Sequence, residues 1–205
     1  MRILRAAILV WLTLFAPGAH SASKTILVLG DSLSAEYGLT RGTGWVSLLE
    51  KRLQAENIDA VVINASISGE TTSGGKSRLG ALLEKHRPAV LVIELGGNDG
   101  LRGLSIRASE ENFRSMITVA KKSGAKVLLV GMQIPPNYGR DYTDRFSALY
   151  RKLAKETRSA LAPFLLAGVA ERPELFQPDR MHPNAQAHPI MLDNVWPHLK
   201  PLLIK

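Results

Sequence analysis

The stretch Thr25-Ile-Leu-Val-Leu-Gly-Asp-Ser-Leu-Ser34 decides how the rest of the chain is interpreted. Five residues that favour β-structure end at Gly30, which is typical of a buried parallel strand. In an open α/β sheet, ligands bind beyond the carboxyl ends of the strands. An amphipathic stretch follows, so we place Ser32 on a strand-to-helix turn at that edge, as a candidate nucleophile. The alternative is that Ser32 and Ser34 are ordinary caps of the next helix.

Apolar runs alternate with helical patterns along the rest of the chain. The apolar runs predict strands over residues 26–29, 60–63, 90–95, 127–130 and, more weakly, 160–165. Apolar residues three or four apart predict helices over residues 45–56, 75–85, 109–122, 142–158 and 189–199, the last with a break near Pro197. Such alternation indicates parallel strands joined by right-handed crossovers. The predicted fold class is therefore α/β, a three-layer α/β/α sandwich.

The composition is that of a globular protein with a full core, since 45% of the 205 residues are hydrophobic and 21% are charged. The absence of cysteine excludes disulfides and thiolate sites, and no histidine pair has a spacing typical of zinc. We expect neither a metal nor a cofactor. The net charge of +8 is spread over helix faces without interleaved aromatic residues, so we expect no nucleic-acid partner. Weak attraction to anionic lipid or acyl substrates is the alternative role for this charge.

The first 21 residues differ from the rest of the chain. Arg2 and Arg5 form a basic start, residues 6–16 are apolar, and Ala19-His-Ser21 offers small residues at the two positions that a signal peptidase reads. We expect residues 1–21 to be a secretory signal and residues 22–205 a single domain in the periplasm. An uncleaved membrane anchor is the alternative, but the apolar stretch is shorter than the roughly 20 residues that span a bilayer.

Polar residues that suit acyl transfer follow four of the predicted strands. Ser32 follows the first strand, Gly69 the second, Asn98 the third, and Asp179 and His182 the fifth. Parallel strands bring all four loops to one edge. There Ser32 is the candidate nucleophile, with His182 as its base and Asp179 to orient that base. The backbone N–H groups of Ser32 and Gly69 and the amide of Asn98 are candidate oxyanion donors.

Each of these residues has an ordinary structural alternative. Gly69 alone suits a turn, Asn98 alone suits a loop cap, and an aspartate three residues before a histidine occurs by chance. Their combination favours catalysis. The turn is not the Gly-x-Ser-x-Gly elbow of the α/β-hydrolases, because Ser34 stands where the last glycine should be and the serine follows the first strand.

These residues resemble the GDSL or SGNH hydrolase family, which is named for the Ser, Gly, Asn and His of four sequence blocks. All four are present in order, and the resemblance covers residues 22–205. Residues 64–69, 94–103 and 135–139 resemble the periplasmic branch of multifunctional acyl-CoA thioesterases, lysophospholipases and arylesterases. The resemblance implies a flavodoxin-like five-stranded sheet of order 2-1-3-4-5. It also implies a triad and an oxyanion hole at the residues named above.

Two positions depart from the family's pattern. Arg180 stands in the last block where the family usually has glycine, and Glu70 stands where aspartate is common. Neither removes a catalytic group, although Arg180 can alter the turn that aims His182.

Several further residues near the motifs have open roles. Asp31 either orients the nucleophile loop or caps the next helix, and Asp99 and Arg102 can simply fasten their own loop. The resemblance suggests that Ile134, Pro135 and Tyr138 form one wall of an acyl groove; the alternative is packing of the loop.

The leading hypothesis is a serine esterase and thioesterase that hydrolyses small acyl esters and thioesters, including lysophospholipids, through an acyl-enzyme on Ser32. A carbohydrate O-deacetylase on the same fold is one alternative. A flavodoxin-like module that binds a nucleotide in its first loop is another, but it leaves Asp179 and His182 unexplained.

Overall fold

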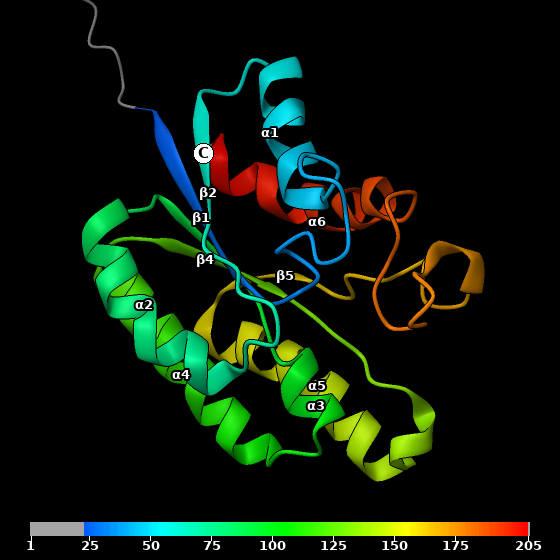
Figure 1. Ribbon diagram of the computed structural model, residues 1–205. Coiled ribbons are helices and arrows are strands. Elements are labelled where there is room, and N and C mark those ends of the chain that lie inside the picture. Colours follow the sequence, from blue (N-terminus) through cyan, green and yellow to red (C-terminus); the bar gives the residue numbers. More distant parts are fainter. Residues whose placement is uncertain (1–22, 205) are drawn as a thin grey trace, which may run out of the picture.

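The computed structural model describes residues 23–204, in which five parallel strands form one sheet in the order β2-β1-β3-β4-β5 (Figure 1). The predicted fold class and the strand order implied by the family resemblance are both confirmed. The signal segment predicted over residues 1–21 lies outside the described residues. The strands are β1 (Lys24–Gly30), β2 (Ala60–Asn64), β3 (Val90–Glu94), β4 (Lys126–Val130) and β5 (Ala160–Ala162).

Helices cover both faces of the sheet. Two long helices pack together on one face, and three pack together on the other (Figure 1). The first pair is α1 (Trp45–Ala55) and α6 (His188–Leu203), and the other three are α2 (Thr72–His86), α4 (Ile106–Lys122) and α5 (Arg140–Thr157). Short helices lie in the loops: α3 (Gly97–Leu101), η1 (Pro136–Tyr138) and η2 (Pro173–Leu175).

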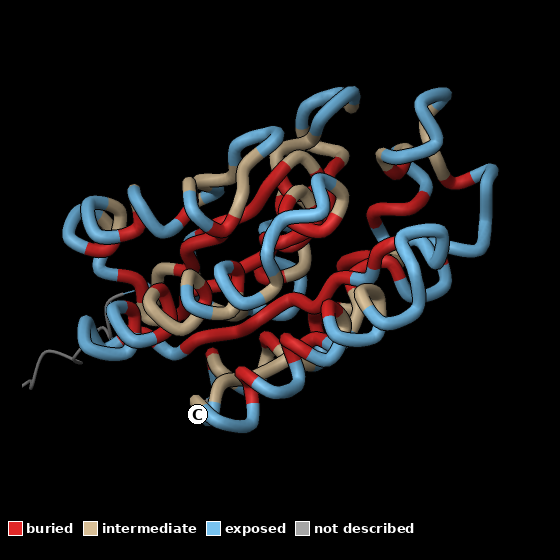
Figure 2. Tube along the Cα trace, turned by 90° about the horizontal axis from the view of Figure 1, so that it is seen from below, coloured by how far each residue is buried: buried red, intermediate tan, exposed pale blue. Residues whose placement is uncertain are grey.

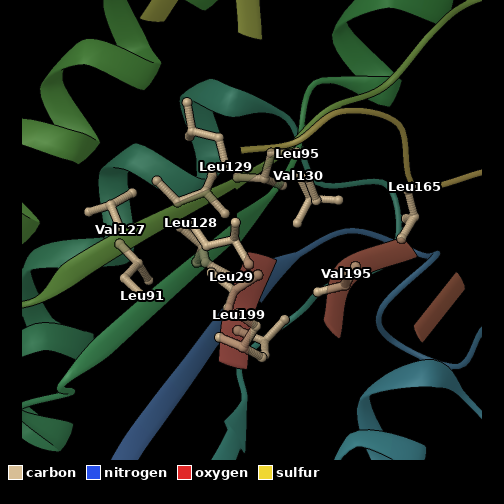
Figure 3. Packing of buried hydrophobic residues seen from close by; sticks show 14 of the residues in the cluster. Leu29, Leu91, Leu95, Val127, Leu128, Leu129, Val130, Leu165, Val195 and Leu199 are labelled. Atoms are coloured by element: carbon tan, nitrogen blue, oxygen red, sulfur yellow. The ribbon is translucent and has the colours of Figure 1, made fainter. Parts of the chain in front are cut away.

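The core lies on both sides of the sheet, because a parallel sheet covered by helices buries the side chains of both faces. All five residues of β3 are buried, and so are residues 26–30 of β1. Figure 2 shows the buried positions concentrated in the middle of the molecule. Figure 3 labels members of this core from the strands and from α6, among them Leu29, Leu91 and Leu199. This rigid centre supports the loops at the carboxyl edge.

The structure corrects three of the predictions, and the helices predicted from residues 75, 109 and 142 begin two or three residues earlier. No helix follows β1 directly: residues 32–38 form turns, and α1 begins only at Trp45, so Ser32 does not lie on a strand-to-helix turn. Strand β5 ends at Ala162, since Pro163 has no N–H to continue a ladder. Helix α6 runs on through Pro197 to Leu203. A proline inside a helix costs about 3 kcal/mol, and the buried face of α6 offsets that cost.

Candidate active site

The candidate residues converge at the carboxyl edge of the sheet, where they line one cavity of about 1180 Å³. Ser32 lies two residues beyond β1, and Gly69 lies in the loop that joins β2 to α2. Asn98 is in α3, which follows β3. Asp179 and His182 belong to the irregular segment between β5 and α6. Strand direction thus brings together residues that are far apart in the sequence.

Ser32, His182 and Asp179 form a continuous chain of hydrogen bonds. The distance from Ser32 Oγ to His182 Nε2 is 3.0 Å, and that from His182 Nδ1 to Asp179 Oδ2 is 2.6 Å. The other carboxylate oxygen of Asp179 accepts the backbone N–H groups of His182 and Met181, at 3.0 and 2.9 Å. The pKa of Asp179 is lowered to about 2 by the backbone N–H of His182, then by the imidazole and by the N–H of Met181. The ionised carboxylate therefore holds the proton on Nδ1 and leaves Nε2 free to accept the hydroxyl of Ser32.

Two residues that sequence reasoning missed also support the position of His182, one directly and one through the backbone. The ring of Tyr37 lies against it, with 4.3 Å between the ring centroids. The side-chain amide of Gln177 donates to the carbonyls of Tyr37 and Pro183, at 2.9 and 3.0 Å. Gln177 thus ties the loop after β1 to the segment that carries His182. Nothing local in the sequence pairs residues 140 positions apart.

The three candidate oxyanion donors differ in whether they already have a hydrogen-bond acceptor. Within residues 23–204, the backbone N–H groups of Ser32 and Gly69 have no hydrogen-bond acceptor, and both residues line the cavity. The φ angle of Gly69 is +79°, a conformation that favours glycine. The amide of Asn98 instead donates to Asp31 Oδ2 at 3.2 Å and to the carbonyl of Glu70 at 3.0 Å. These two acceptors fix the orientation of the Asn98 amide. An oxyanion that binds there would share the N–H hydrogens of Asn98 with Asp31 and Glu70.

Asp31 fastens the nucleophile turn and does not cap a helix, because no helix begins beside it. It is buried, and its Oδ1 accepts the N–H of Leu33 at 3.0 Å while Oδ2 accepts the amide of Asn98. Burial raises the pKa of Asp31 to about 6, against the lowering effect of these hydrogen bonds and of His182. Asp31 therefore joins the turn that carries Ser32 to one of the candidate oxyanion donors.

Asp99 and Arg102 fasten loops to one another. The buried carboxylate of Asp99 accepts the N–H and hydroxyl of Thr72 and the hydroxyl of Ser109, which ties the starts of α2 and α4 to α3. Arg102 donates to the carbonyl of Gly69 at 3.1 Å. The loop that carries Gly69 is thus held in place by contacts from Asp99 and Arg102, in α3 and directly after it.

The three predicted groove residues do line the cavity. Ile134 is buried, and the hydroxyl of Tyr138 donates to the carbonyl of Leu101 at 2.9 Å, so packing accounts for part of their contacts. Other apolar lining residues were not identified from the sequence: Met132, Phe164, Leu166 and Phe176. Three of these four lie in the segment after β5, where no periodic pattern marks them. The lining of the cavity as a whole is therefore mostly apolar.

Arg180 lies between Asp179 and His182 and has a left-handed backbone, with φ at +56°. Its N–H donates to the carbonyl of Gln177 at 2.9 Å, which closes the turn. The turn that aims His182 is therefore formed with arginine where the family usually has glycine.

No helix in the part of the chain that the structure describes is long and apolar enough to cross a membrane.

Comparisons with known proteins show which family the chain is similar to. The sequence pattern of the GDSL-like lipase/acylhydrolase family matches residues 28–190. Esterase TesA of Pseudomonas aeruginosa is 52% identical over 184 residues, which are 90% of this chain and 92% of the relative. A crystal structure of TesA, 52% identical in sequence, superposes with a TM-score of 0.86 and covers 88% of this chain and all of that one.

Two further relatives also have the names of enzymes that cleave esters or thioesters. Thioesterase 1/protease 1/lysophospholipase L1 of Escherichia coli K12 is 43% identical over 89% of this chain and 86% of its own length. An arylesterase of Vibrio mimicus is 45% identical over 83% of this chain and 86% of its own length.

Proposed function

The chain belongs to the GDSL-like lipase/acylhydrolase family, and from this premise we propose that Ser32 is the nucleophile of its reaction, with His182 as base and Asp179 as the carboxylate that orients it. The protein is an enzyme, a serine hydrolase that acts on ester and thioester bonds; its relatives over most of the chain are named esterase, thioesterase and arylesterase. The single observation that supports the residue roles is the hydrogen-bonded chain from Ser32 Oγ through the imidazole to Asp179.

The proposed reaction has two steps. Ser32 Oγ attacks the acyl carbon while its proton moves to His182 Nε2, and the negative charge on the carbonyl oxygen is stabilised by N–H donors of Ser32, Gly69 and Asn98. The tetrahedral intermediate collapses, the bond to the leaving group breaks, and the alcohol or thiol takes the proton from His182. Water then attacks the acyl-enzyme, assisted by the same imidazole, and releases the carboxylic acid and the free serine.

The apolar lining of the cavity supports an acyl chain as the part of the substrate that is bound beside Ser32. We propose small acyl esters, acyl thioesters and lysophospholipids as substrates. The groove residues Ile134, Pro135 and Tyr138 would then contact the acyl chain. Hydrolysis of p-nitrophenyl esters of increasing chain length, an acyl-CoA and a lysophosphatidylcholine compares these classes in one assay series.

Replacing Ser32 by alanine tests the nucleophile. In Ser32→Ala we expect kcat for p-nitrophenyl esters to fall by roughly 10⁶-fold, the loss that follows removal of the serine from a triad of this kind. A fluorophosphonate should label the wild-type enzyme on the peptide that contains Ser32 and leave the variant unlabelled. Retained turnover in a folded Ser32→Ala protein would exclude this residue as the nucleophile.

We also propose that residues 1–21 direct export to the periplasm and are then removed. The basic start, the apolar stretch and the small residues at Ala19 and Ser21 support this. Expression of the full chain in a Gram-negative host, followed by N-terminal sequencing of the periplasmic fraction, should give a mature protein that begins near residue 22. Recovery of the intact N-terminus from the membrane fraction would favour the uncleaved anchor instead.

A further inference from the structure

We propose that Glu94 is a positioning residue for Ser32, and that it acts through the hydroxyl of Ser34. This inference rests on the proposed function, because it concerns the orientation of the proposed nucleophile. Glu94 is the last residue of β3 and is fully buried. It does not line the cavity, so it acts on the reaction only through other residues.

Glu94 contacts the turn that carries Ser32 at two residues, Ser34 and Asp31. Its Oε2 accepts the hydroxyl of Ser34 at 2.7 Å and lies 3.4 Å from the N–H of Asp31. Ser34 Oγ in turn accepts the indole N–H of Trp45 at 3.2 Å. The hydroxyl is therefore fixed between a donor at the start of α1 and an acceptor at the end of β3. Its rotation is restricted on both sides.

Gly30 shows how closely this carboxyl approaches the turn. Glu94 is the register partner of Gly30 across the β1–β3 pair. A Cβ atom at position 30 would lie 2.7 Å from Ser34 Oγ and 2.8 Å from Glu94 Oε2. A side chain there would displace the hydrogen bond. The glycine before the nucleophile turn thus provides the space in which Glu94 and Ser34 meet.

The two residues that Glu94 contacts stand on either side of Ser32. The N–H of Ser34 also donates to the carbonyl of Asp31 at 3.2 Å, which closes the turn around Ser32. The path of this turn sets the direction in which Ser32 Oγ points toward His182. It also sets the direction of the Ser32 N–H. A misplacement of about 1 Å can cost about a hundredfold in rate. Holding the turn is therefore a condition for the proposed chemistry.

A purely structural role explains this carboxyl poorly. Glu94 Oε1 is buried without a hydrogen-bond partner among the described residues, and an orphaned polar atom destabilises the fold. Burial raises the pKa of Glu94 well above its usual range, and the nearby carboxyl of Asp31 adds to the effect. The contact itself is geometric: Oε2 accepts the hydroxyl of Ser34.

The test compares kcat and KM of variants at a temperature well below their unfolding transitions. Glu94→Met keeps the length of the side chain and removes the acceptor, so kcat should fall between about tenfold and about a hundredfold while KM changes less than about twofold. Ser34→Ala removes the other end of the same contact and should give a loss of similar size. Glu94→Gln keeps an acceptor oxygen and should retain more of kcat than Glu94→Met.

The rate constant of fluorophosphonate labelling provides a second readout, because it reports the nucleophile without substrate release. It should fall in parallel with kcat. Thr157→Val is the matched control: it removes a hydroxyl whose hydrogen bond to the carbonyl of Leu153 lies at the end of α5, away from the cavity. This control should keep the wild-type kcat.

Wild-type kcat and labelling in both Glu94→Met and Ser34→Ala would overturn the inference, even with a lower melting temperature. If Glu94→Met does not fold, Ser34→Ala decides. Failure of the proposed function looks different: Ser32→Ala would then remain active, whatever the Glu94 variants do.

Discussion

At the scale of single residues, Arg180 has a left-handed backbone within the turn that carries the proposed base. A non-glycine residue at a φ angle of +56° is disfavoured by about 1–2 kcal/mol, because its Cβ approaches the following carbonyl. The position lies between Asp179 and His182. The distance of 2.6 Å from Asp179 Oδ2 to His182 Nδ1 depends on the path of this turn. The rest of the turn, including the bond from the Arg180 N–H to Gln177, holds the arginine in place.

Replacing Arg180 by glycine should therefore stabilise the protein. Glycine adopts this conformation without strain but loses about 0.5–1 kcal/mol through its greater freedom in the unfolded chain. We expect a net increase of up to about 1 kcal/mol in the free energy of unfolding, or about 2–4 °C in melting temperature. Thermal unfolding measures this difference. Arg180→Ala is the control, since it removes the same side chain and keeps the strain. A lower melting temperature for Arg180→Gly than for the wild type would contradict this account.

At the scale of elements, the starts of α1 and α6 are joined. Helix α1 has no side-chain cap at Gly44, and the N–H of Trp45 donates to His188 Nδ1 at 3.0 Å. The carboxylate of Glu36 accepts the N–H groups of Gly42 and Gly44 from the preceding loop. The N–H groups of Gly44 and Trp45 at the start of α1 are therefore accepted by Glu36 and by His188, and no local capping pattern predicts the contact with His188, 143 residues away.

His188 should make stability depend on pH. Burial lowers its pKa to about 4, although the backbone at Pro183 and the charge of Glu36 act in the opposite direction. Between pH 6.5 and 4 the unfolded chain binds a proton at this histidine and the folded chain does not. The free energy of unfolding therefore falls as the pH drops through this window, by up to about 3 kcal/mol at about 1.4 kcal/mol for each pKa unit. Above pH 6.5 the contribution of His188 is fully present.

Urea denaturation of the wild type and of His188→Gln at pH 7 and pH 4.5 measures this contribution. Glutamine does not titrate, and its side-chain oxygen can accept the N–H of Trp45. The variant should therefore lose less stability than the wild type on acidification, while the remaining titrating groups affect both proteins alike. Equal losses in the two proteins would show that His188 does not carry the effect.

At the scale of the whole molecule, the sheet order explains why the site can be formed at all. Strands β1 and β3 are neighbours in the centre, so the turn of Ser32 and the helix of Asn98 emerge side by side. The long segment after β5 must then cross the edge to bring His182 to Ser32, which lies 150 residues earlier. Its irregular course lines the cavity with Phe164, Leu166 and Phe176. The same segment therefore carries the proposed base and much of the apolar wall.

The sequence by itself determined the class of fold, the approximate position of each strand and the loops on which the candidate triad lies. It did so because burial on both faces of a parallel sheet leaves continuous apolar runs, and because the motif residues follow those runs directly. It also offered Gly69 as a turn residue or an oxyanion donor, and the structure gives this glycine a φ angle of +79° in its loop.

Only the tertiary structure decided which side chains meet. The bonds from Glu94 to Ser34, from Gln177 to Tyr37 and from His188 to Trp45 join segments 60, 140 and 143 residues apart. Local periodicity records burial, but the partner of a buried polar group depends on how distant loops pack. For the same reason α6 continues through Pro197: packing of its buried face outweighs the local preference that predicted a break.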